Sequence, residues 1–194
     1  MDTNKLEEAF QLFDEYNSKD AKMYKWEGVD YPQELFFAQR VFDWVKKLNP
    51  NASDALLLAS RCQHIGRWEV PRESYPDGKV GYLNWRSNLA VYHADKAAEL
   101  LRQAGIDEEI INNVQRIVLK KQIKLDEEVQ IIENALCLVF LEFEFDGFSK
   151  KHGSEKVIRI LQKTWGKMSE PGRAEALKLT FSEREAELIK QALA

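Results

Sequence analysis

Apolar side chains recur every three or four residues along most of the chain, and this spacing limits the fold more than any other feature of the sequence. In the run ELFFAQRVFDWVKKL, Phe37, Val41 and Trp44 fall on one face of a helix. The Asn49-Pro50 pair then ends that helix. The sequence has no sustained alternation of apolar and polar residues, which is the pattern of a half-buried strand. We therefore predict an all-α protein built from many helices.

Capping residues and helix breakers set the expected ends of the helices. Asp107 and Asp126 each open an acidic first turn, which suits the positive end of a helix dipole. Gly105 ends a long preceding helix. We expect helices over residues 5–17, 34–48, from Asn51 or Ser53 toward Gly66, 83–104, from 107, 126–145, 154–165, 171–177 and 182–193, with a turn-rich link at 17–32 and an ordered loop at 68–81.

Length, charge and cysteine content limit the class of protein. A chain of 194 residues is long enough for one large domain, and we expect a single one. The net charge of −4 argues against a general nucleic-acid or anionic-membrane binder, because both need a summed positive field. The N-terminal run MDTNKLEEAF lacks the features of a signal peptide, and the longest apolar run is too short to span a membrane. Cys62 and Cys137 lie in apolar helical runs, which is typical of reduced thiols in a cytoplasmic protein.

A dense polar cluster follows the apolar run that begins at Leu56. The stretch LLLASRCQHIGRWEVPR brings a histidine, a carboxylate and three guanidinium groups into a short segment. His64 could be a general base, a metal ligand, or a cation favoured by a helix C-terminus. A purely structural histidine remains the alternative. Because polar clusters at the ends of buried helices often line pockets, we predict a pocket around His64, with His64 and Glu69 as catalytic candidates.

The arginines of this region suggest an anionic ligand. Guanidinium groups match the oxygens of phosphate and carboxylate groups two at a time. The alternative is that these arginines pair with nearby glutamates such as Glu69 and Glu73. Aromatic residues of the same region could stack on a base, although such residues are more often core. The candidate ligand-binding residues are Arg61, Gln63, Arg67, Trp68, Arg72, Trp85 and Arg86, and Lys120-Lys121 is expected to be a solvated face.

The predicted helix over 126–145 is apolar nearly all round but contains three glutamates. Glu133 and Glu144 fall on nearly the same helical face, whereas Glu142 lies about opposite to Glu133. We expect at least one of them to be buried or to face a cavity.

Several motifs carry a resemblance to a known family. The blocks RCQHIGRWEVPRESYP, GYLNWR, HADKAAELLRQAG, ENALCLVFLE and KHGSEKVIRILQKTW resemble the uncharacterised domain-of-unknown-function family 4202, from about Tyr31 onward. That family has no established activity to carry over to this chain.

More distantly, the chain resembles the HD-domain metal-dependent phosphohydrolases. The segment 62–66 takes the place of their apolar-His-Asp-Ile-Gly motif, and 93–99 resembles a later helix. The resemblance implies an HD-like core over about 31–149, preceded by an N-terminal helix and loop at 1–30 and followed by C-terminal helices at 150–194. This chain departs from the HD pattern at three places. Gln63-His64 stands where the family has a His-Asp pair. The family's first histidine would fall near Phe37, and its last aspartate near Asn134 or Leu136.

An HD-like fold would bring the surviving polar residues together. Two imidazoles and a carboxylate are enough to hold one divalent metal and to leave a position for water. We predict hydrolysis of a small phosphorylated compound such as a nucleotide. A non-catalytic module that binds a small anionic ligand is the alternative, and iron-dependent oxygen chemistry has less support. The candidate metal ligands are His64, His93, Glu133 and Glu142.

Overall fold

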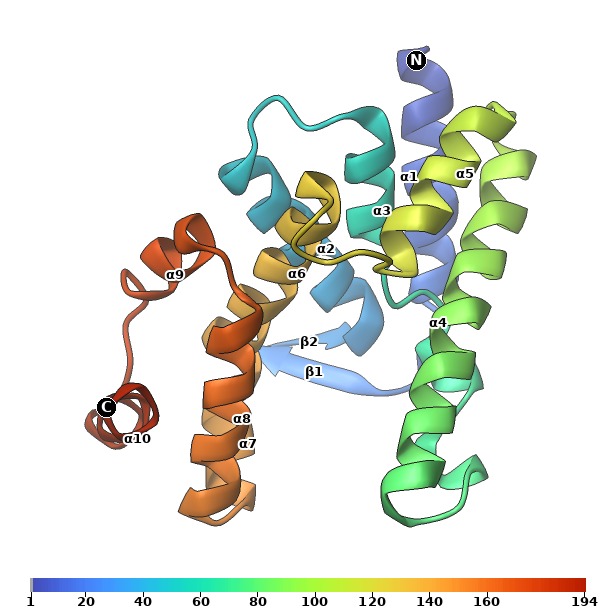
Figure 1. Ribbon diagram of the computed structural model, residues 1–194. Helices are drawn as coiled ribbons and strands as arrows, with labels where there is room; N and C mark the ends of the chain where they lie inside the picture. The colour runs from blue at the N-terminus through green and yellow to red at the C-terminus, as the bar shows by residue number, and fades with distance from the viewer. Residues whose placement is uncertain (1) are drawn as a thin grey trace. The chain divides into compact units, whose positions relative to one another are not determined.

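The computed structural model describes residues 2–194 and is predominantly helical (Figure 1). The prediction of an all-α fold is confirmed. The chain divides into two compact units, with unit 1 ending at Lys121 and unit 2 beginning at Gln122. The single domain expected from the sequence stays a prediction. In residues 2–194 no helix combines the length and the apolar character that a membrane crossing requires.

Unit 1 is organised around a short central helix, α3, that packs against α1, α2 and α5. The side chains of Leu56, Leu58 and Cys62 are fully buried there. Ser53 caps the helix by accepting a hydrogen bond from the Leu56 backbone N–H at 3.1 Å, as one of the two predicted caps. In Figure 1, α4 and α5 run side by side. The elements are α1 (Thr3–Asn17), β1 (Met23–Trp26), β2 (Val29–Pro32), α2 (Gln33–Leu48), α3 (Asp54–Cys62), the 3₁₀ turns η1 (Arg67–Glu69) and η2 (Arg72–Ser74), α4 (Gly78–Gln103) and α5 (Glu108–Val118).

A two-stranded hairpin stands where we expected only a turn-rich link. Strands β1 and β2 pair antiparallel, with Met23 opposite Pro32 and Trp26 opposite Val29. The two residues between them, Glu27 and Gly28, both have positive φ angles, of 50° and 83°. This is the backbone shape that lets a two-residue turn follow the twist of its strands. Strands of four residues are too short to show a clear alternation in the sequence.

Unit 2 is a smaller helical assembly in which α8 packs against α10 and α6 packs against α8 and α9. The side chains of Ile132, Leu138, Phe145 and Val157 are fully buried. The helix predicted over 126–145 is interrupted near its end by a π-helical turn. The elements are α6 (Glu127–Val139), the π turn η3 (Phe140–Glu144), α7 (Phe145–Lys151), α8 (Ser154–Lys167), α9 (Glu170–Ala176) and α10 (Glu183–Leu193).

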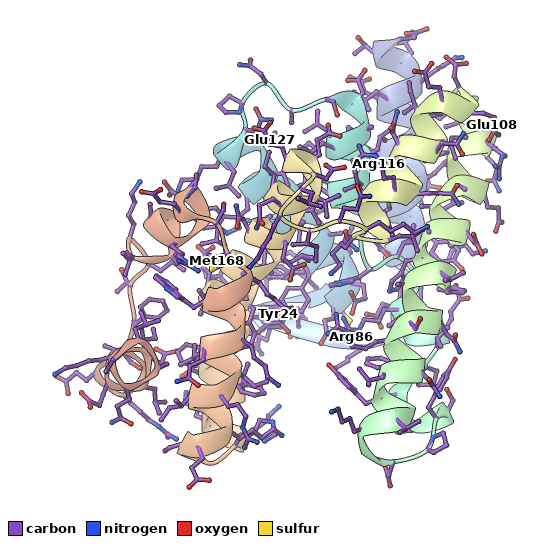
Figure 2. All side chains as sticks on the ribbon, viewed as in Figure 1. Tyr24, Arg86, Glu108, Arg116, Glu127 and Met168 are labelled. Atoms are coloured by element: carbon purple, nitrogen blue, oxygen red, sulfur yellow. The ribbon has the colours of Figure 1, made fainter. Side chains whose placement is uncertain are left out.

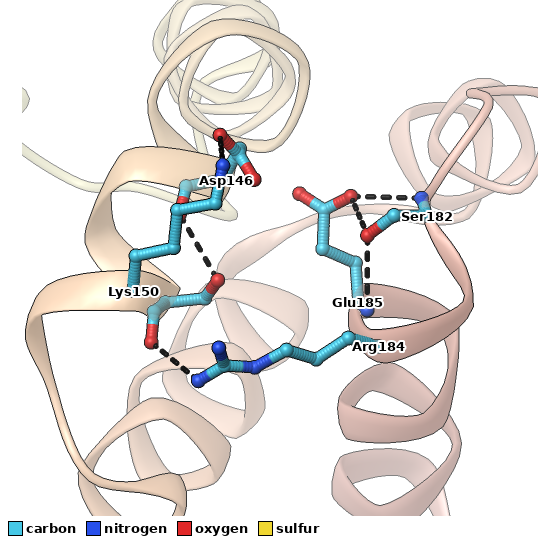
Figure 3. A network of polar contacts seen from close by, with 6 residues as sticks. Asp146, Lys150, Ser182, Arg184 and Glu185 are labelled. Carbon is cyan, nitrogen blue, oxygen red and sulfur yellow. Dashed lines mark hydrogen bonds and ion pairs between the residues drawn. The ribbon is translucent and has the colours of Figure 1, made fainter.

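Local hydrogen bonds fix the ends of the helices in unit 2, as Figure 3 shows for α10. The Ser182 Oγ atom accepts from the Glu185 backbone N–H, and the Glu185 carboxylate accepts from the Ser182 backbone N–H at 2.8 Å. This reciprocal arrangement is the predicted capping box. Arg184 also donates to the Ser149 carbonyl at 3.1 Å, so α10 is held against the end of α7.

Gly66 lies in the turn that carries His64, and the side chains of Tyr92 and Tyr16 pack closely against it. Its φ angle is 66°, a region that other residues rarely adopt. A Cβ atom at this position would lie 2.8 Å from the Tyr92 Oη atom and 3.0 Å from the Tyr16 Cε1 atom. Gly28 also has a positive φ angle, but a Cβ atom there would meet nothing within 4 Å.

The comparison of these two glycines predicts unequal effects of alanine. Gly66→Ala should lower the free energy of unfolding by about 2–4 kcal/mol, because it adds steric contact to backbone strain. Gly28→Ala should cost only about 1 kcal/mol, from strain alone. Urea denaturation followed by circular dichroism measures both. Equal losses in the two variants would contradict the packing argument.

Candidate functional site

Two histidine rings lie against each other in unit 1. His64 follows the end of α3, and His93 belongs to the middle of α4. Their ring centroids are 5.7 Å apart, with an angle of 50° between the ring planes. The His93 residue is only 2% exposed, whereas His64 is half-buried. The structure therefore brings together two of the four predicted metal ligands, which are 29 positions apart in the numbering.

A hydrogen bond fixes the protonation pattern of His93. Its Nδ1 atom lies 2.7 Å from the Ile65 carbonyl oxygen. Because a carbonyl oxygen only accepts, Nδ1 carries the proton and Nε2 is left as an unprotonated acceptor. The Nε2 atom is buried and has no hydrogen-bond partner among the described residues. The ring thus holds an unused lone pair.

Gln63 supplies a second unused acceptor. Its amide nitrogen donates to the Val118 carbonyl at 3.0 Å, which fixes the orientation of the amide group. Its Oε1 atom is buried and, like Nε2 of His93, has no partner among residues 2–194. Both atoms need a donor, because a buried polar atom without a partner costs free energy.

Positive side chains lie near the two rings: Arg67 and Lys120 act on both, and Arg86 acts on His64. Burial, followed by the nearby Arg67, His93, Lys120 and Arg86, holds the pKa of His64 well below its usual range. Burial, together with Arg67 and Lys120, lowers the pKa of His93 to about 4, although the bond to Ile65 opposes this change. Both rings are therefore neutral at pH 7. We call His64, His93, Arg67, Arg86 and Lys120 the histidine cluster.

Lys120 belongs to this cluster although the sequence predicted a solvated face for it. It follows the C-terminal end of α5, where its φ angle of 50° turns the chain, and it is half-buried. A left-handed backbone conformation at a lysine leaves no clear signal in a sequence. The contribution of Lys120 could be found only once α4 and α5 were placed beside each other.

The residues of the histidine cluster do not fit a divalent metal. Three cationic side chains beside two neutral imidazoles would repel a metal cation. Neither unit, over residues 2–194, contains a group of three or more His, Cys, Asp or Glu side chains that could hold a metal ion.

In unit 2, Glu133 is buried with a carboxylate oxygen 3.0 Å from the Lys167 Nζ atom, and Glu142 is exposed. The expected burial of at least one of these glutamates is confirmed, and the metal itself stays a prediction.

Two of the predicted ligand-binding arginines make structural contacts instead. The Arg61 guanidinium donates to both carboxylate oxygens of Asp14, with the Nε–Oδ1 distance at 2.7 Å. This agrees with the alternative interpretation that the arginines of this region form ion pairs, although the partner here is an aspartate of α1. Arg72 donates to the carbonyls of Tyr75 and Pro76, both at 2.9 Å, and so shapes the loop before α4. A ligand role for either arginine stays a prediction.

Glu69 is held by two tyrosine hydroxyls. Its carboxylate accepts from the Tyr16 hydroxyl at 2.5 Å and from the Tyr92 hydroxyl at 2.6 Å. These bonds lower the pKa of Glu69, so the group is ionised at pH 7 and is not a proton donor there. The Trp68 ring lies 5.7 Å from the Tyr16 ring. Glu69 and Trp68 therefore connect the loop after α3 to α1, and their catalytic and binding roles stay predictions.

Aromatic rings position the two other arginines. Trp85 is 8% exposed and donates its Nε1–H to the Val70 carbonyl at 2.8 Å. The Arg67 guanidinium lies 5.5 Å from the centre of the Trp85 ring, a cation–π arrangement. Arg86, labelled on α4 in Figure 2, lies 6.0 Å from the Tyr82 ring and is exposed. Trp85 thus supports Arg67, and its stacking on a ligand stays a prediction.

The lowered pKa of His93 predicts that acid destabilises unit 1. The unfolded ring takes up a proton below about pH 6.5, whereas the folded ring resists protonation until about pH 4. Stability is therefore complete above pH 6.5 and falls by about 3 kcal/mol as the pH drops to 4. His64 acts in the same direction. Urea midpoints measured between pH 7 and pH 4.5 test this, and His93→Asn should show a shallower dependence. An unchanged dependence in that variant would contradict the assignment.

Comparisons with known proteins identify a family without a known activity. A family model described as "Domain of unknown function (DUF4202)" matches residues 7–189. No curated protein and no solved structure matches the chain significantly. Because the match covers nearly the whole sequence, the chain belongs to the family of the domain of unknown function DUF4202.

Proposed function

We propose that the protein binds a small phosphorylated ligand at the histidine cluster. The observation that carries this proposal is the pair of histidine rings 5.7 Å apart, with Arg67 held 5.5 Å from the neighbouring Trp85 ring, and the positive charges of Arg67, Lys120 and Arg86 contribute to the lowered pKa of His64. An anion at this position would gain from all three positive charges. It would also be held partly out of water, where such interactions are stronger.

The chemistry of the side chains favours phosphate over other anions of similar charge. Guanidinium groups donate two parallel hydrogen bonds to adjacent oxygens of a phosphate, and a lysine adds a point charge. The Arg67 and Arg86 guanidinium groups lie 5.5 Å and 6.0 Å from the centres of the Trp85 and Tyr82 rings. The ligand is therefore expected to present a phosphoryl group to the cluster.

Hydrolysis of the bound compound is the second candidate, and one observation favours it. The Nε2 atom of His93 is unprotonated and makes no hydrogen bond to the described residues, as a general base requires. This supports His93 as the base, whereas the sequence favoured His64. Cys62 and Cys137 are buried reduced thiols, which supports the predicted cytoplasmic location.

Loss of one arginine of the cluster should weaken phosphate binding. Arg67→Gln or Arg86→Gln should each raise the dissociation constant for inorganic phosphate and for adenosine monophosphate about tenfold, which corresponds to one charge-assisted contact. Isothermal titration calorimetry measures the change. Arg102→Gln is the matched control, because it removes the same charge from an exposed arginine of α4 that pairs with Glu108. Equal affinities in all three variants, or no binding by the unmodified protein, would refute the proposal.

Catalysis can be separated from binding by the same ligands. If the protein is a hydrolase, it should release phosphate from nucleotides in the presence of a metal chelator, since the cluster does not fit a divalent metal. His93→Asn should abolish turnover while phosphate still binds, because Nε2 is the only ring atom with an unused lone pair. A colorimetric phosphate assay measures the release. Binding without turnover in the unmodified protein would leave the non-catalytic module as the function.

A further inference from the structure

We propose that an apolar pocket in unit 2 binds a compact, uncharged group, such as the aromatic ring of a small organic compound. The pocket holds about 370 Å³ of empty space, part of which is open to solvent. All of its lining residues belong to unit 2, whereas the histidine cluster belongs to unit 1. The site therefore goes beyond the function proposed above and does not depend on it.

Helices α8 and α10, which pack against each other, each contribute one side to the pocket (Figure 1). Within each helix the lining positions follow the spacing i, i+3 and i+4, which places them on one face. These residues are Leu161, Thr164 and Trp165 of α8, and Ile189, Ala192 and Leu193 of α10. The pocket is thus formed by the packed faces of two regular helices, with α9 and the π turn completing it.

Two small side chains account for the empty space. Ala176 of α9 and Ala192 of α10 both line the pocket, and both are buried. Most of the other lining positions carry leucine, isoleucine or an aromatic residue. A methyl group fills much less volume than these side chains, and packed helices close such a gap only in part. The size of the pocket therefore depends on having alanine at these two positions.

The chemistry of the lining favours an apolar ligand. Within residues 2–194 no charged side chain lines the pocket, and its surface is almost wholly apolar. The Trp165 carbonyl is already used, because it accepts from the Arg173 Nε atom at 3.1 Å. A polar or charged group would lose its hydrogen bonds to water on entry and find few to replace them. Apolar cavities of this kind stay dry and bind molecules such as benzene.

The shape and the rim of the pocket suit a ring. The aromatic rings of Trp165 and Phe181 line it, and such rings pair favourably with another aromatic group. Two further lining residues, Leu177 and Leu193, are 68% and 40% exposed and so mark the open side. A bound apolar group would remove part of their surface from water. A partner helix, about 10–12 Å wide with its side chains, is too large for this space.

The first test titrates the unmodified protein with fluorobenzene and follows the fluorine signal of the probe by NMR. We expect saturable binding, with nuclear Overhauser contacts from the ring protons to the methyl groups of Leu161 and Ile189. No binding up to the solubility of the probe, or contacts only to residues outside the pocket, would overturn the proposal. The space would then be a packing gap and not a binding site.

A second test fills the pocket. Ala192→Leu should raise the dissociation constant for fluorobenzene at least about tenfold, because the added side chain takes the space of the ring. Ala186→Leu is the matched control, since it makes the same change at an exposed position of α10 and should leave the affinity within about twofold. Circular dichroism shows whether both variants fold. Unchanged binding by folded Ala192→Leu would contradict the proposal, and if that variant does not fold, the contacts measured in the unmodified protein decide.

Discussion

The hydrogen bond between the His93 Nδ1 atom and the Ile65 carbonyl is the contact on which the site depends. It joins the middle of α4 to the turn that follows α3, and so it sets the two histidine rings side by side. It also decides which ring nitrogen carries the proton. The remaining nitrogen, Nε2, is an unprotonated acceptor that is buried and has no partner in residues 2–194.

The proposed ligand of the histidine cluster has to suit both the neutral imidazoles and the positive side chains near them. The neutral imidazoles alone would suit a metal ion, because each ring can offer a lone pair. The neighbouring Arg67, Arg86 and Lys120 change the balance, since a divalent cation would meet three positive groups. In the function that we propose, the same charges attract an anion.

The helices could be predicted from the sequence because their signals are local. The Ser182–Glu185 capping box and the Ser53 cap depend on residues only three positions apart. The site was predictable only in part. The segment around His64 stood out by its composition, but the partner of Arg61 lies 47 residues away in α1. Lys120 joins the cluster through packing between helices, and such long-range contacts leave no trace in neighbouring residues.

The contacts of α1 have a practical consequence for work with fragments of this protein. Asp14 holds Arg61, Tyr16 holds Glu69, and Asn17 accepts from the Gly66 backbone N–H at 3.4 Å. The three residues that α1 contacts in this way, Arg61, Glu69 and Gly66, flank His64 in the sequence. A recombinant fragment that begins at residue 31 would therefore lack the scaffold that shapes the loop beside the rings. Expression trials should keep the amino-terminal helix intact.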